Sequence, residues 1–97
     1  MNNFIPLYGI AWFQPEQWDR LLEISVDRDE LEDTHKEWEL QASKMIHDLR
    51  ERGHKIEKVG FDLEEFLYWC NSNDNESNSS ARAEYVAVVM KNKDGQS

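Results

Sequence analysis

The pattern of side chains near the start of the chain predicts a strand that leads directly into a helix. Residues 7–13, LYGIAWF, are apolar on both faces, as in a strand that is covered on each side. Pro15 suits the first turn of a helix, because its missing N–H has no partner to lose there. In that register Phe13 packs on Trp18 as a hydrophobic staple. We therefore expect these aromatic rings to belong to the core, and the alternative is that Trp12 and Trp18 stack on a sugar or a base.

A second, longer helix is predicted over residues 29–52. Apolar side chains recur there every three or four positions, which is the period of one helix face. Asp29 with Glu32 matches a capping box at its start, although Asp27 with Glu30 fits the same template. Gly53 can end the helix in a left-handed conformation. The stripe consists of Leu31, His35, Trp38, Ala42, Met45 and Leu49, with Ile46 beside it.

Residues 54–61, HKIEKVGF, predict a second strand, and a third helix follows it. Asp62 is the predicted cap of this helix, Glu65 completes a capping box, and Phe61 packs on Phe66 as a second staple. The helix is expected to face the core with Leu63, Phe66, Leu67 and Cys70.

The two strand-to-helix joints match at an offset of 48 residues, since Phe13 corresponds to Phe61 and Trp18 to Phe66. The match suggests a duplicated β-α-α unit. It fades on either side, however, so independent use of the same helix-start chemistry is the default explanation, and the question stays open.

The last third of the chain alternates between polar and apolar segments. Residues 71–80, NSNDNESNSS, are expected to form a mobile surface loop without core residues. A cap at Ser80 and several alanines favour a helix over residues 83–90, whereas the valines there would suit a strand. Residues 93–97 are predicted to be a disordered tail.

Together these patterns predict a single, mostly helical α+β domain over residues 1–92, with the order β-α-α-β-α-α and a two-stranded sheet. A chain of 97 residues is long enough for one hydrophobic core. Cys70 is the only cysteine, which excludes an internal disulfide and fits a reducing compartment. The first residues lack a basic region and a long apolar stretch, so we expect a cytoplasmic protein.

The formal net charge of −9 limits the classes of partner. Affinity for nucleic acid or an anionic membrane comes largely from Lys and Arg, so we expect neither as a partner. A mimic of nucleic-acid charge that blocks a basic protein is a remaining alternative. Residues 16–39 hold ten acidic residues against three basic ones. This excess either complements the helix macrodipole or forms an acidic docking face.

One set of side chains has the spacing of metal ligands. An E-x-x-H pair on a helix projects both side chains to one side, as in di-iron carboxylate bundles. Glu32 and His35 have this spacing, and Glu39 lies four residues further on. The chain contains no glycine-rich phosphate loop, nucleophile elbow or C-x-x-C motif, and Cys70 lies among apolar neighbours that raise a thiol pKa. We therefore expect no cofactor and no catalysis.

Three stretches of the chain resemble a family of small bacterial proteins that share an A-W-F/Y, then W-x-x-L, then E-W arrangement. They are YGIAWFQPEQWDRLLEISVDRDELEDTHKEW, KVGFDLEEFLYWC and ARAEYVA, which together extend over most of the chain. The resemblance implies a free-standing bacterial domain in the cytoplasm, and it brings no activity and no site residues.

The leading interpretation is a non-enzymatic interaction or regulatory protein, whose partner is another protein or a second copy of the chain. One candidate surface contains Tyr68 and Trp69, which widen the apolar stripe of the third helix beyond what one core contact needs. The other is the acidic face, from which Asp29 and Asp33 are the candidate contact residues. The alternative is a small metal-binding protein or metal-assisted enzyme that uses Glu32, His35 and Glu39.

Overall fold

The computed structural model describes residues 7–94, and the side chains of residues 7–92. The chain forms one compact α+β domain in the predicted order β-α-α-β-α-α. Short 3₁₀ turns, η1 and η2, precede and follow the first helix. The elements are β1 (Leu7–Ala11), η1 (Pro15–Gln17), α1 (Trp18–Ile24), η2 (Arg28–Glu30), α2 (His35–Glu51), β2 (Lys55–Val59), α3 (Leu63–Ser72) and α4 (Ser79–Asp94).

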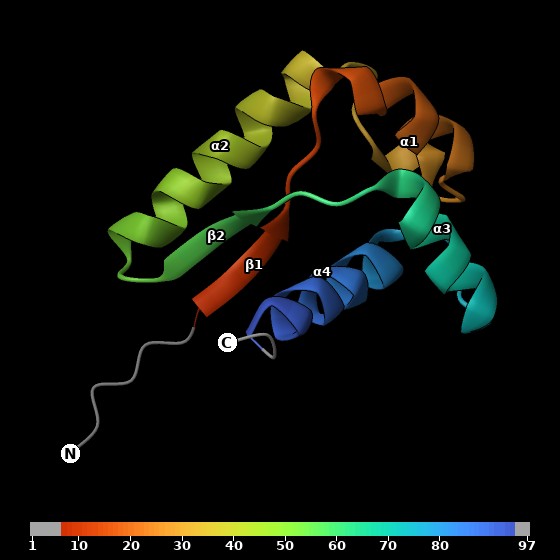
Figure 1. Ribbon diagram of the computed structural model, residues 1–97. Coiled ribbons are helices and arrows are strands. Elements are labelled where there is room, and N and C mark those ends of the chain that lie inside the picture. The colour runs from red at the N-terminus through yellow and green to blue at the C-terminus, as the bar shows by residue number, and fades with distance from the viewer. Residues whose placement is uncertain (1–6, 95–97) are drawn as a thin grey trace.

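The two strands pair in parallel, and the two longest helices lie on opposite faces of the sheet (Figure 1). Leu7 lies opposite Lys55 and Ala11 opposite Val59, an offset of 48 residues. A parallel pair needs a long crossover connection, which α1 and α2 provide here. The offset equals the one at which the two strand-to-helix joints match in sequence. The joints therefore lie side by side at the same end of the sheet.

β1 is less covered than its sequence pattern suggests. Leu7 and Tyr8 are 50% and 49% exposed, and the other three residues of the strand are partly buried. The prediction of a strand covered on each side is wrong for these first two residues. The reason is that a sheet of two strands leaves β1 with a free edge, along which solvent reaches the strand.

α2 begins at His35, six residues after the predicted start at residue 29. Its cap is Thr34, whose Oγ1 accepts a hydrogen bond from the Glu37 N–H at 3.2 Å. Neither predicted capping box forms. Asp27 is held in an ion pair elsewhere, and the next three residues form the separate turn η2.

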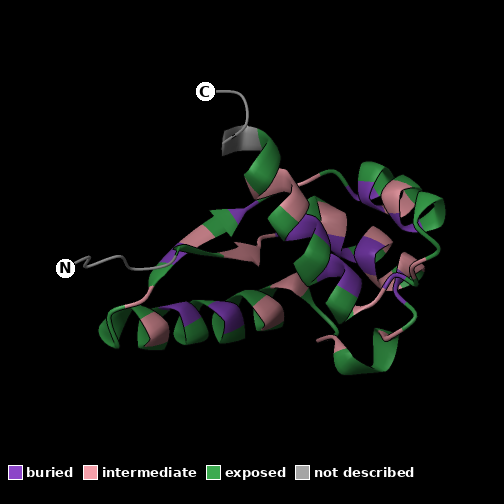
Figure 2. Ribbon diagram, turned by 90° about the horizontal axis from the view of Figure 1, so that it is seen from below, coloured by how far each residue is buried: buried purple, intermediate pink, exposed green. Residues whose placement is uncertain are grey.

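The end of α2 agrees with the prediction. The helix stops at Glu51, and Gly53 follows with a φ of 92°, in the left-handed region where glycine is favoured. Its apolar stripe is only partly covered, because Ala42 and Ile46 are buried whereas Met45 is 45% exposed. Figure 2 shows most of the outer surface of this helix in the colour of exposed residues.

Both joints between strand and helix contain the predicted staple. The ring centroids of Phe13 and Trp18 lie 6.3 Å apart, and those of Phe61 and Phe66 lie 5.6 Å apart. Asp62 caps α3, since its Oδ1 accepts the N–H groups of the residues two and three positions later at 2.8 and 3.0 Å. Both staples and the Asp62 cap are confirmed, whereas the capping-box bond expected from Glu65 does not form among the described residues.

A contact between the two joints unites the core. The ring centroids of Phe13 and Phe61 lie 5.6 Å apart, and the rings meet edge to face. Phe61 packs against both clusters of buried residues that the core contains. The first cluster is Phe13, Trp18, Leu21 and Leu63, and the second is Phe66, Cys70, Ala81 and Tyr85.

The C-terminal segment is a helix, which decides between the two alternatives for residues 83–90. α4 is capped by Asn78, whose Oδ1 accepts the Ala81 N–H at 2.9 Å, so the predicted cap at Ser80 is wrong. The helix includes residues 93 and 94 of the expected tail, and residues 95–97 lie outside the described part of the chain.

The polar segment 71–80 contributes more to the fold than its composition suggests. Ser77 is 5% exposed, and its carbonyl oxygen accepts the Val26 N–H at 2.9 Å. The expectation that this segment supplies no buried residue is therefore wrong. This main-chain hydrogen bond joins two segments that are distant in sequence, so it cannot be predicted from the composition of the side chains.

The start of α4 is tied to the loop after α1 by a buried ion pair. Arg82 donates from Nη2 to Asp27 Oδ2 at 2.6 Å and from Nη1 to Oδ1 at 3.2 Å. Its Nη1 also donates to Ser25 Oγ at 3.3 Å. Burial alone would raise the pKa of Asp27, but the bonds and charge of Arg82 outweigh it and hold this pKa below its usual value.

We expect that Asp27→Asn lowers the free energy of unfolding by about 3 kcal/mol at neutral pH, because it leaves the buried guanidinium without a counter-charge. Since the folded-state pKa of Asp27 is depressed, its stabilisation is present above the unfolded-state value and is lost as the pH falls through the folded-state pKa. Denaturation at several pH values should therefore show the two proteins converging in acid. Asp33→Asn is the matched control, because Asp33 pairs with Arg28 in an exposed position and should change stability little.

Gly9 permits the close approach of α4 to β1. A Cβ atom at this position would lie 2.7 Å from Val86 Cγ1 and 3.2 Å from Val59 Cγ2, whereas one at Gly60 would meet only the Trp12 carbonyl at 3.7 Å. Gly9→Ala should lower the free energy of unfolding by about 1–3 kcal/mol through overpacking. Gly60→Ala should leave it nearly unchanged. Equal midpoints of urea unfolding for the two variants would contradict this account of α4 packing.

Candidate functional site

The predicted metal ligands do not form a site. Glu32 precedes α2, so Glu32 and His35 do not share the helix face that their spacing requires. His35 Nε2 lies 2.6 Å from the Phe13 carbonyl oxygen and must donate, because a carbonyl only accepts. Glu39 is exposed on α2. Among the described residues, no group of three or more His, Cys, Asp or Glu side chains is placed to hold a metal ion.

The acidic side chains around η2 differ in exposure. Asp27 is buried against Arg82, while Asp29 and Asp33 are exposed. Asp33 also forms an ion pair with Arg28 at 3.4 Å. Asp29 and Asp33 therefore remain accessible surface carboxylates, whereas Asp27 does not.

Tyr68 and Trp69 line a cleft of about 540 Å³ between α3 and α4. Tyr68 is 75% exposed, and Trp69 is partly buried with its ring centroid 5.2 Å from that of Tyr85 on α4. Val88 extends the apolar surface one turn further along α4. The two predicted aromatic side chains are thus brought together with residues from a second helix.

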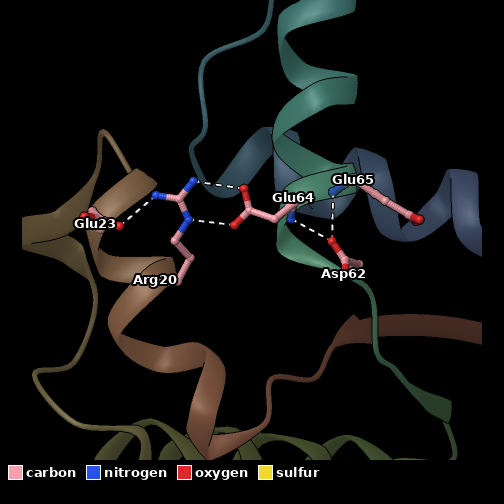
Figure 3. Close-up of polar contacts among 5 residues, drawn as sticks. All are labelled: Arg20, Glu23, Asp62, Glu64 and Glu65. Carbon is pink, nitrogen blue, oxygen red and sulfur yellow. Dashed lines mark hydrogen bonds and ion pairs between the residues drawn. The ribbon is translucent and has the colours of Figure 1, made fainter.

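Carboxylates from the first turn of α3 form one rim of this cleft. Glu64 accepts two hydrogen bonds from Arg20 of α1, at 2.7 and 2.9 Å, as Figure 3 shows. Arg20 also bonds Glu23 at 2.7 Å. These bonds raise the pKa of Arg20 and lower that of Glu64, so both stay charged, with the single guanidinium shared between two carboxylates.

Glu65 lies beside this pair without a cationic partner among the described residues, and Figure 3 shows its side chain pointing away from Arg20. Burial raises the pKa of Tyr85, and the charge of Glu65 raises it further. The Tyr85 hydroxyl therefore stays protonated at neutral pH. The cleft combines aromatic surface with one uncompensated negative charge at its rim.

Tyr85 and Val88 were not predicted as site residues. Their spacing of three positions on a helix would have placed them on one face, but only if the segment had first been assigned to a helix. The assignment was open because valines suit a strand equally. The packing of α4 against α3 also could not be predicted from local sequence patterns.

Cys70 is 1% exposed in the core between α3 and α4, and burial raises its thiol pKa. This confirms the expectation that apolar neighbours raise the pKa of this thiol. No helix of the described chain is long and apolar enough to cross a membrane.

Comparisons with protein-family models, with curated proteins and with solved structures found no match for this chain. The resemblance to small bacterial proteins therefore stays a prediction.

We expect the native protein to react very slowly with Ellman's reagent at mildly alkaline pH, because the Cys70 thiol is both inaccessible and poorly ionised. The same protein in denaturant should react at the rate of a free thiol. Rapid reaction of the folded protein would contradict the structural role of Cys70.

Proposed function

We propose that this protein is a small non-catalytic interaction protein, whose cleft between α3 and α4 binds a basic, partly apolar segment of a partner protein. The observation that carries the proposal is the cleft itself. It joins the exposed ring of Tyr68 and the partly buried ring of Trp69 to the unpaired carboxylate of Glu65.

The aromatic surface supports an interface. Tyr and Trp are enriched at the centres of protein interfaces, where their rings contribute a large contact area at low entropic cost. Tyr68, which is 75% exposed, lines the same cleft as the apolar side chain of Val88, so a segment that fills the cleft would remove both from water. An apolar side chain on the partner segment fits this floor.

The charge distribution supports a basic segment. Glu64 is held in its bonds with Arg20, which leaves Glu65 as the carboxylate at this rim without a cationic partner among the described residues. A Lys or Arg side chain over the Trp69 ring could pair with Glu65 and gain a cation–π contact at once. Asp29 and Asp33 lie outside the cleft and add only long-range attraction, which the net charge of −9 reinforces.

The free cysteine indicates the compartment in which the protein acts. A single, buried, reduced cysteine fits a reducing compartment, and we place the interaction in the bacterial cytoplasm.

A titration of isotope-labelled protein with synthetic peptides tests the proposal. The probe is a helix-forming peptide of Leu and Lys, and its counterpart has Glu in place of every Lys. Only the Lys peptide should bind, it should shift the NMR signals of Tyr68, Trp69 and Val88, and added salt should weaken it. Glu65→Gln and Tyr68→Ala should each raise the dissociation constant by about tenfold or more.

Matched controls lie on α2. Glu39→Gln removes an exposed carboxylate and Leu40→Ala removes an exposed apolar side chain, 59% accessible, and neither lines the cleft. Circular dichroism should show all four variants folded. Equal loss of affinity in the control variants, or binding of the Glu peptide at the same affinity, would overturn the proposal.

A further inference from the structure

Within residues 7–94, β1 has a strand partner on one side only. The Trp12 N–H donates to the Val59 carbonyl oxygen at 2.8 Å, and strand geometry then turns the main-chain groups of Tyr8 and Ile10 toward β2 as well. The N–H and C=O groups of the residues between them, Gly9 and Ala11, point to the opposite edge. Among the described residues no strand pairs with that edge.

The outer edge of β2 is protected, and that of β1 is not. Arg50 Nη2 donates to the Ile56 carbonyl oxygen at 3.0 Å, which closes part of the β2 edge. β2 also carries Lys55 and Lys58, and charged side chains are a common means of preventing an edge strand from pairing. β1, with the sequence LYGIA, has no charged residue and no proline.

A hollow of about 390 Å³ runs along the free edge of β1. One wall comes from α2, with Trp38 and Met45, and the other from α4, with Ala83 and Val86. Arg82 is the only charged residue that lines it, and the buried pair with Asp27 neutralises that charge. The groove therefore accepts an extended, uncharged segment, because a charged side chain in it would lose water without gaining a partner.

We propose that this groove is the interface of a homodimer, in which β1 of one copy pairs antiparallel with β1 of a second copy about a two-fold axis. The two sheets would then form one sheet of four strands. Centring the axis on Gly9 places Gly9 opposite its symmetry mate and Leu7 opposite Ala11. These are the residues whose main-chain groups face outward, so the pairing is self-complementary.

Charge identifies the second copy as the occupant. Two copies of a chain with net charge −9 repel each other, so a contact between copies costs least where the surface carries no charge. The β1 edge and its groove form such a surface. Of the two described strands, only β1 is both extended and uncharged, whereas β2 has the sequence KIEKV.

The walls of the groove are needed for a stable dimer. Specific interfaces bury about 800 Å² on each partner, which is more than a five-residue strand can supply. Leu7, Tyr8 and Met45 are 50%, 49% and 45% exposed on the strand and the groove wall, and they would provide further apolar area. This interface is separate from the cleft between α3 and α4 and does not depend on its function.

Sedimentation of the full chain over a range of concentrations tests the proposal. The wild-type protein should dimerise, and salt should strengthen the dimer because it screens the repulsion between acidic copies. Met45→Lys places a charge in the groove, and Leu7→Pro removes an outward N–H that β2 does not use. Each should raise the dimer dissociation constant by about tenfold or more. Leu40→Lys, on the far side of α2, is the matched control and should leave it unchanged.

Hydrogen exchange supplies a readout that a loss of folding would not imitate. The amides of Gly9 and Ala11 should be protected at high protein concentration and exchange rapidly at low concentration, while those of Tyr8 and Ile10 stay protected at both. A strict monomer at all concentrations would overturn the proposal. So would a dimer that Met45→Lys and Leu7→Pro leave intact.

Discussion

The parallel register of the two strands is the constraint on which the rest of the structure depends. It sets Ala11 beside Val59. Two residues further along each chain segment, where the strand gives way to the helix, the ring centroids of Phe13 and Phe61 lie 5.6 Å apart. Phe61 packs against both clusters of the core, as Ile24 of α1 also does, so this register places one of the side chains that join them. A slip by one residue would turn the side chains of a strand to the opposite face and separate the two joints.

Polar contacts far apart in sequence complete what the register begins. The ion pair between Asp27 and Arg82 holds the loop after α1 against the start of α4, across 55 residues of sequence. A buried pair of this kind adds less to stability than its short distances suggest, because both charges lose water. Its clearer effect is on geometry. It ties the first turn of α4, which begins after the Asn78 cap, to the loop after α1.

The charge of the chain has opposite consequences for the two proposed surfaces. At the cleft, Glu65 and the acidic surroundings would attract a basic segment, and the attraction would be strongest in low salt. At the β1 edge, the same net charge would oppose association and salt would relieve it. The fold keeps the two surfaces apart, since one lies between α3 and α4 and the other along the free edge of the sheet. Dimerisation would therefore leave the cleft accessible.

The sequence by itself determined the features that depend on residues a few positions apart. These include the staples of Phe13 on Trp18 and Phe61 on Phe66, the Asp62 cap, and the end of α2 before Gly53. Tertiary structure decided the start of α2, because Asp27 pairs with Arg82, residues 28–30 form the separate turn η2, and the helix begins only after the Thr34 cap. It also decided that the valine-rich segment is a helix and that Tyr85 forms the second wall of the cleft. Local chemistry fixes where a helix can begin, but the competition between near and distant partners for the same side chain is settled only when the chain is folded.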